Sequence, residues 1–506
     1  MRRIWKVITS RLLIIAPLVI AQFVVFAGFL YNVAILAELQ PFFSLFAVLT
    51  SIYVINRPED PAYKIAWLLV ILGAPVIGIP LYIMAGNRHV PKKLYNGTTE
   101  ASQEMVGILS HRNDLDTSDE PEDIKQIFNY AYKTSGFPVY RNTESKYYKS
   151  GEEWFPDYLE ALRNAKKFIF MEFFIINDGS CWQEILAILK QKAQEGVGVK
   201  LIYDDFGSIT LPYDYDLQLR RCGIEAYRFN KVRAAFIIQM NNRDHRKITV
   251  IDNEVAFTGG VNLSDEYINR ERRFGVWKDS AIRIKGYAVW SFSVMFLGMF
   301  TYCRGPKYPM DYMKYKLPTE PTSDGGYYQP YSDTPTDSKP VALNMHLNIV
   351  NSARKYVYID TPYLILNETM IQALCRAAQS AIDVRILVPH IPDKKTVFQI
   401  TRGSYERLMK NGVRIYEYTP GFNHAKNFVS DDRLAIVGTA NTDYRSYFLH
   451  FENGLLMYKT KEVLRIRDDF LNSLAKSHEV TLEELNKEFF IVRIVRAILN
   501  VLIPLV

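Results

Sequence analysis

Residues 245–252 read HRKITVID, and residues 424–431 read HAKNFVSD. Both octapeptides follow the pattern H-x-K-x-x-x-x-D, and the second begins about 180 residues after the first. Each is followed by a segment that contains glycine and ends in asparagine, TGGVN at 258–262 and VGTAN at 437–441. A correspondence of this kind indicates that one structural unit occurs twice in the chain.

The segments before each octapeptide also correspond. An apolar strand pattern, a helical period and a second strand pattern precede both: residues 168–176, 182–195 and 199–205 in the first half, and residues 356–364, 368–380 and 384–389 in the second. Strand, helix and strand in this order are typical of a mixed α/β sheet. We therefore predict an α/β fold built as a pseudo-symmetric duplication of one mixed β-sheet domain flanked by helices. Residues 305–341 are rich in proline and glycine, which predicts an irregular connection or a lid.

Three apolar runs near the N-terminus predict an association with the membrane. Residues 12–37 carry no charge, and this run exceeds the ~20 residues that a helix needs to cross a bilayer. The run at 41–55 is shorter, and the run at 65–86 is interrupted by glycine and proline. Basic residues on both sides of this region favour the cytoplasm, so we predict two full spans, a third run that does not cross, and a cytoplasmic catalytic region. A cleaved signal peptide is the alternative for the first run, and the runs that follow argue against it.

The C-terminus predicts a second membrane contact. Arg493 and Arg496 share one helical face within an otherwise apolar run, which favours a helix on the membrane surface over one packed on the protein's own core. The predicted parts are a membrane region at 1–94, one repeat at 95–305 and the other at 306–486, and the surface helix at 487–506.

The net charge and the cysteines indicate which class of partner and which redox environment to expect. The net charge of +7 suits either nucleic acid or anionic lipid, and the apolar runs decide for lipid. The four cysteines are far apart and form no C-x-x-C pair, which indicates reduced thiols and neither a disulfide framework nor a zinc site.

The repeated residues suit attack on a phosphodiester. A neutral imidazole can form a bond to phosphorus, and a second, protonated imidazole can give its proton to the leaving oxygen. In a strand, residues i and i+2 share a face, so Lys247 should project beside His245 and Lys426 beside His424. Cations and amides around the phosphate stabilise the growing negative charge. Neither half holds the full set, so we predict one site between the halves, with no metal and no cofactor.

The asparagines that follow the motifs, Asn262 and Asn441, complete this set as candidate ligands of the substrate phosphate.

The motif segments resemble those of the phospholipase D superfamily and, within it, the bacterial cardiolipin synthases. The resemblance rests on NRDHRK at 242–247, FTGGVNLSDEY at 257–267, TPY at 361–363, FNHAK at 422–426 and GTANTDYRS at 438–446. It covers nearly the whole chain, and the hydrophobic leader matches as well. Thr439 stands where the superfamily usually has serine, and it keeps the hydroxyl.

The resemblance implies that two phosphatidylglycerols give cardiolipin and glycerol. It also implies that His245 is the nucleophile and that His424 is the general acid and then the base, although the near-symmetry of the site leaves the opposite order open.

The resemblance also assigns carboxylates. Asp252 and Asp431 belong to the catalytic motif, and in the superfamily such residues tend to be structural. A later carboxylate orients each histidine, and we expect Asp279 to do so for His245 and Glu452 for His424. Ordinary surface ion pairs are the alternative.

Other functions would use the same catalytic residues. A phospholipase D that hydrolyses phosphatidyl lipids is one alternative, and a related phosphatidyltransferase such as phosphatidylserine synthase is another. The apolar runs argue against a nuclease, and the intact motifs argue against a non-enzymatic scaffold. The expected partners are phosphatidylglycerol and anionic membrane lipids, not nucleic acid, and the expected location is the cell membrane, as a multi-pass protein.

Overall fold

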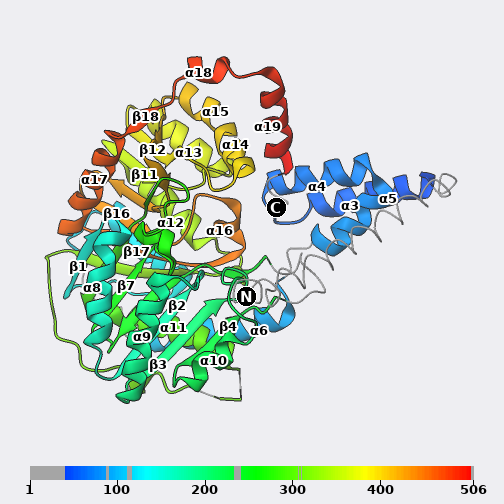
Figure 1. The fold of residues 1–506 in the computed structure, drawn as a ribbon. Helices are drawn as coiled ribbons and strands as arrows, with labels where there is room; N and C mark the ends of the chain where they lie inside the picture. The colour runs from blue at the N-terminus through cyan, green and yellow to red at the C-terminus, as the bar shows by residue number, and fades with distance from the viewer. Residues whose placement is uncertain are drawn as a thin grey trace. The chain divides into compact units, whose positions relative to one another are not determined.

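The computed structural model describes residues 40–86, 90–110, 117–232, 241–305, 307–308 and 310–502. The described parts of residues 1–92 and 488–506 form a smaller unit, and residues 93–231 and 242–487 form a larger one (Figure 1). The apolar run at 12–37 lies outside the described residues.

The smaller unit is helical. It consists of α3 (Gln40–Ile55), α4 (Pro61–Gly73), α5 (Pro75–Leu81), a π-helical turn (Tyr82–Gly86) and α19 (Phe490–Leu502). Its core is aromatic: the ring of Trp67 meets Tyr63 and Tyr82 edge-on. Across the part of the chain that the structure describes, no helix is both long and apolar enough to cross a membrane.

The first sheet of the larger unit has seven strands. Its order is β1 (Thr143–Tyr148), β9 (Ala281–Gly286), β7 (Val255–Gly259), β6 (Lys247–Ile251), β2 (Phe168–Phe173), β3 (Gly198–Asp204) and β4 (Glu225–Phe229). Successive residues of β2 point to opposite faces. Phe170 stacks on Phe296 of α11 (Val289–Arg304), whereas Met171 joins the core that contains Trp182 of α9 (Ser180–Gln194). Helices therefore cover both faces, as the sequence predicts.

The second sheet repeats this order. It runs β10 (Tyr327–Asp333), β17 (His450–Tyr458), β16 (Leu434–Gly438), β15 (Asn427–Ser430), β11 (Tyr356–Asp360), β12 (Asp383–Pro389), β13 (Arg414–Tyr418) and β18 (Ser477–Glu479). Strand for strand, the first seven match the first sheet, which confirms the duplication. The segment predicted to be irregular, residues 305–341, contains β10, which pairs with β17 along its whole length.

Further helices surround the two sheets: α6 (Lys92–Leu109), α7 (Glu122–Ser135), α8 (Gly151–Arg163), α10 (Tyr215–Arg221), α12 (Val341–Ser352), α13 (Glu368–Gln379), α14 (Lys395–Gly403), α15 (Tyr405–Lys410), α16 (Tyr444–Phe448), α17 (Lys461–Leu474) and α18 (Leu482–Asn486). Tyr358 of β11 stacks on Phe470 of α17, whereas its neighbours Val357 and Ile359 face the core beneath α12 and α13. The second half thus has the same helix–sheet–helix layering as the first.

Two short parallel strand pairs join the halves. β5 (Arg243–Asp244) pairs with the start of β17, and β14 (Gly421–Asn423) pairs with β8 (Val276–Lys278). Side chains add to this contact, because Asn453 donates to Thr258 Oγ1 at 2.8 Å and Ser280 Oγ donates to Asn427 Oδ1 at 2.9 Å. Each half therefore pairs its pre-motif strand with a strand of the other half.

Candidate active site

Each motif histidine lies where the chain changes its pairing partner. His245 sits between β5, which pairs with the other half, and β6, which pairs with β2 of its own half. Its backbone N–H donates to Phe451 O at 2.9 Å, and that of His424 donates to Lys278 O at 2.6 Å. The histidines therefore precede the strands, and the expected strand geometry for His and Lys does not apply. The change of partner brings both motifs to the seam between the halves.

The orienting carboxylates are exchanged relative to our expectation. His245 Nδ1 lies 2.9 Å from Glu452 Oε1, and His424 Nδ1 lies 2.6 Å from Asp279 Oδ2. The expected pairing, Asp279 with His245 and Glu452 with His424, is wrong. The reason is the strand pairing across the seam: Glu452 is on β17, which pairs with β5, and Asp279 follows β8, which pairs with β14. Each histidine is held by a carboxylate from the opposite half.

Both carboxylates are fully buried and hydrogen-bonded. Thr439 Oγ1 donates to Glu452 Oε2, and Ser280 N donates to Asp279 Oδ1 at 2.8 Å. Burial works against the Glu452 anion, but the adjoining His245 holds the pKa of that carboxyl well below its usual range. The hydroxyl of Thr439, noted as the departure from serine, therefore supports the carboxylate that orients His245.

The histidines are almost fully enclosed, with 5% of His245 and 6% of His424 exposed. Burial lowers the pKa of His245 to about 3, and burial together with Lys426 lowers the pKa of His424 to about 4. With Nδ1 of each ring facing a carboxylate, Nε2 is the nitrogen left to meet a substrate. Burial thus favours the uncharged form of each ring, which suits a nucleophile.

The motif lysines are buried beside the histidines. Lys247 Nζ donates to the carbonyl of His245 at 2.5 Å, and Lys426 Nζ donates to the carbonyl of His424. Burial lowers the pKa of Lys247 to about 7 and that of Lys426 to about 8, and each lysine senses carboxylates of both halves, Glu452 and Asp279. An anionic substrate favours the charged form of both lysines, so its binding would complete a cationic site for phosphate.

The predicted phosphate ligands, Asn262 and Asn441, are buried, and each is hydrogen-bonded within its own half. Asn262 accepts from Ile175 N at 3.0 Å and donates to Tyr267 OH at 2.8 Å. Asn441 donates to Asp443 at 3.2 Å, and its Oδ1 is buried without a hydrogen-bond partner. Their contact with substrate phosphate stays a prediction.

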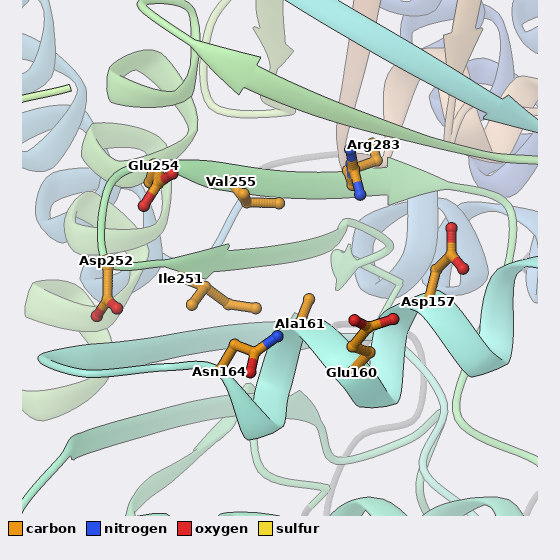
Figure 2. A pocket seen from close by; sticks show the side chains of 9 residues that line it. All are labelled: Asp157, Glu160, Ala161, Asn164, Ile251, Asp252, Glu254, Val255 and Arg283. Carbon is orange, nitrogen blue, oxygen red and sulfur yellow. The ribbon is translucent and has the colours of Figure 1, made fainter. Parts of the chain in front are cut away.

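The motif aspartates, Asp252 and Asp431, lie away from the motif histidines and lysines. Asp252, at the far end of β6 from Lys247, accepts the backbone N–H groups of residues 166–168 at 2.7 Å. Asp431 does the same for residues 354–356. Asp252 lines a hollow of about 260 Å³ together with residues of α8, of the β6–β7 hairpin and of β9, whose side chains are labelled in Figure 2. The geometry favours the structural role that we expected for both aspartates.

Sequence reasoning missed the rings that enclose the histidines. Phe174 lies 5.0 Å from the ring of His245, and Trp277 lies 5.2 Å from that of His424. His450 lies 5.4 Å from the ring of His245. The sequence shows a histidine, His450, two residues before Glu452. Nothing in the sequence links this histidine to the first motif.

Comparison with known proteins identifies both repeats and part of the N-terminal region. The family model "Cardiolipin synthase, PLD-like domain" matches residues 158–288 and 347–474, and "Phospholipase D-nuclease N-terminal" matches residues 45–87. An uncharacterized protein of Streptococcus mutans is 41% identical over 90% of this chain and 99% of its own length. A cardiolipin synthase of Halalkalibacterium halodurans is 33% identical over 90% of this chain and 92% of its own.

Among solved structures, phosphatidylserine synthase of Haemophilus influenzae covers 78% of this chain and 100% of its own, with a TM-score of 0.58 and 15% identity. At that identity the likeness concerns the fold.

Proposed function

The chain belongs to the cardiolipin synthase family of phospholipase D-like phosphatidyltransferases, and on that premise we propose that it joins two phosphatidylglycerols into cardiolipin and glycerol. The observation that carries the proposal is the pair of histidines at one seam, each oriented by a carboxylate of the opposite half. One group can then act as nucleophile while the other manages the proton.

In the first step, Nε2 of His245 bonds to the phosphorus of one phosphatidylglycerol. The bond from phosphorus to the glycerol oxygen breaks, and protonated His424 gives its proton to that oxygen. The negative charge of the bound phosphodiester favours the imidazolium form of His424. Lys247 and Lys426 stabilise the charge on the phosphoryl oxygens, together with Asn262 and Asn441.

In the second step, the terminal hydroxyl of another phosphatidylglycerol gives its proton to neutral His424. Its oxygen bonds to phosphorus, the bond from phosphorus to His245 breaks, and cardiolipin leaves. Water in place of this alcohol would give phosphatidic acid. The near-complete burial of both histidines supports transfer, because an enclosed site limits competition by water.

The exposed surface of the smaller unit supports a location at the membrane. Large apolar side chains are exposed along its helices: Phe42, Leu45, Phe46 and Ile52 of α3, Ile65, Leu69 and Leu72 of α4, and Phe490, Ile491 and Ile498 of α19. Patches of this kind mark lipid or protein contacts. We propose that two of the N-terminal apolar runs cross the cell membrane, that α19 lies on its surface, and that the catalytic unit faces the cytoplasm.

The direct test is to incubate the purified full-length protein with detergent micelles of phosphatidylglycerol and to separate the products. Equal amounts of cardiolipin and glycerol are expected. Phosphatidic acid without cardiolipin would replace the proposal with a hydrolase. A parallel sample with added serine would detect phosphatidylserine, the product of the other alternative.

A further inference from the structure

His450 and Trp277 occupy equivalent positions in the two halves. In the strand pairs across the seam, His450 is opposite Arg243 and Trp277 is opposite Phe422, and each stands two residues before the orienting carboxylate of its half. Each ring also lies beside a motif histidine, His450 by His245 and Trp277 by His424. At this position, therefore, the half-site of His245 has a second imidazole, and the half-site of His424 has an indole.

The imidazole of His450 is left without a hydrogen bond. Its exposed fraction is 8%, and both ring nitrogens are buried with no hydrogen-bond partner. Nδ1 lies 3.6 Å from Glu452 Oε1. A buried polar group without a partner costs free energy, so an arrangement of this kind indicates a ligand that completes it.

We propose that His245, His450 and Glu452 bind one divalent transition-metal ion of the zinc class. Their ligand atoms all lie within 4.8 Å of one another, and within the described ranges of the chain they are the one group of three such residues. Two of the separations are 2.9 Å and 3.6 Å. A tetrahedral ion with bonds of ~2.0–2.1 Å places its ligand atoms ~3.3 Å apart, between these two values.

The ligand chemistry selects the class of ion. Two imidazoles and one carboxylate suit zinc and its neighbours, whereas calcium and magnesium take oxygen ligands. A tetrahedral ion would have one position left for water. Trp277 offers no lone pair to a metal, so the equivalent place beside His424 and Asp279 lacks the third ligand. One ion per chain is expected.

Occupancy would switch off transfer. With the ion on Nδ1 of His245, the ring proton moves to Nε2, which then has no lone pair to offer phosphorus, and Glu452 is drawn away from its orienting role. His245 can then no longer bond to phosphorus. This consequence rests on the proposed function, whereas the binding of the ion does not.

The binding test uses the full-length protein in detergent, stripped of metal, with Co²⁺ alone as the probe. A tetrahedral Co²⁺ absorption in the visible range with one ion per chain is expected. His450→Phe and His450→Gln should abolish it, and Trp277→His should add a second ion. The control is His478→Phe, which removes an exposed histidine whose Nε2 lies 3.0 Å from Glu484. It should leave the spectrum unchanged.

The inhibition test uses Zn²⁺, with each variant compared with its own zinc-free rate. Loss of His450 should raise the half-inhibiting zinc concentration at least about tenfold. Absence of a cobalt spectrum in active wild-type protein overturns the metal site and leaves the synthase standing. A cobalt spectrum in protein that makes no cardiolipin supports the metal site and overturns the proposed synthase function. A spectrum that persists in both His450 variants, each shown to be folded by its melting temperature, overturns the proposal.

Discussion

The two halves of the active site have equivalent strand pairs but different side chains. The pre-motif strands β5 and β14 take equivalent partners, β17 and β8, and each histidine receives one carboxylate across the seam. Yet His245 is beside His450 and Glu452, whereas His424 is beside Trp277 and Asp279. Duplication supplies the architecture, and substitutions within it make the two histidines chemically distinct. Two groups with opposite proton roles require that distinction.

Removal of either histidine should have the largest effect and should separate the two roles. His245→Ala and His424→Ala should each lower cardiolipin formation at least about 10⁴-fold, because nucleophile and proton donor act as a unit. With a substrate whose leaving group needs no proton, such as a phosphatidyl ester of p-nitrophenol, His424→Ala should still release one equivalent of p-nitrophenol. Equal bursts from both variants would contradict the assignment of roles.

Neutralising either orienting carboxylate should cause the next largest loss of rate and should distinguish the two halves of the site. Glu452→Gln and Asp279→Asn should each cost about 10³-fold in rate by removing the partner that fixes the tautomer of its histidine. The exchanged pairing adds a specific expectation. Glu452→Gln should lose the p-nitrophenol burst as His245→Ala does, and Asp279→Asn should keep it. The opposite pattern would restore the pairing inferred from the sequence.

The sequence predicts the local features of this site but not the residues that meet across the seam. The motifs, the duplication and the strands at 168–173 and 356–360 follow from local patterns, since apolar period and spacing are local properties. The partner of His245 is not local: Glu452 reaches it because β17 crosses the seam. His450 depends on the same strand pair, whereas Trp277 reaches His424 through the pairing of β8 with β14. Strand β10 escaped detection because its seven residues, Tyr327 to Asp333, include a proline and several polar groups.

The lysines should contribute less than the carboxylates. Lys247→Met and Lys426→Met should each reduce the rate about 10²-fold, because one charge-stabilising donor is lost while both histidines remain. The effect should fall on the rate of phosphoryl transfer, measured in single turnovers. A loss that appears only as weaker lipid binding would show that the lysines hold the substrate and do not stabilise the transition state.

The motif aspartates should affect stability and not chemistry. Asp252→Ala removes the acceptor of three backbone N–H groups at a residue with φ of 54°, so it should cost on the order of 3 kcal/mol of unfolding free energy. Glu254→Ala, on the same hollow, is the matched control and should cost little (Figure 2). Urea unfolding measures both. A folded Asp252 variant with normal stability and no activity would contradict the structural role.

A buried histidine outside the motifs should give the smallest effect. Burial lowers the pKa of His346 to about 3, and its Nδ1 lies 2.9 Å from Tyr447 OH. Below pH ~6.5 the unfolded chain takes up a proton that the folded chain refuses, so the unfolding free energy falls as the pH drops from about 6.5 towards 3. His346→Phe should flatten this slope between pH 7 and pH 5, and an unchanged slope would exclude His346 as a cause.

We propose that one site spans both halves and that its covalent intermediate forms on His245. The most direct measurement is to react the protein with phosphatidylglycerol labelled at phosphorus, quench in alkali, digest, and locate the phosphorylated histidine by mass spectrometry. The expected result is phosphohistidine at residue 245 in the wild-type protein, retained in Asp279→Asn and lost in Glu452→Gln. A label on His424, or a label on His245 that survives Glu452→Gln at full yield, would contradict the claim.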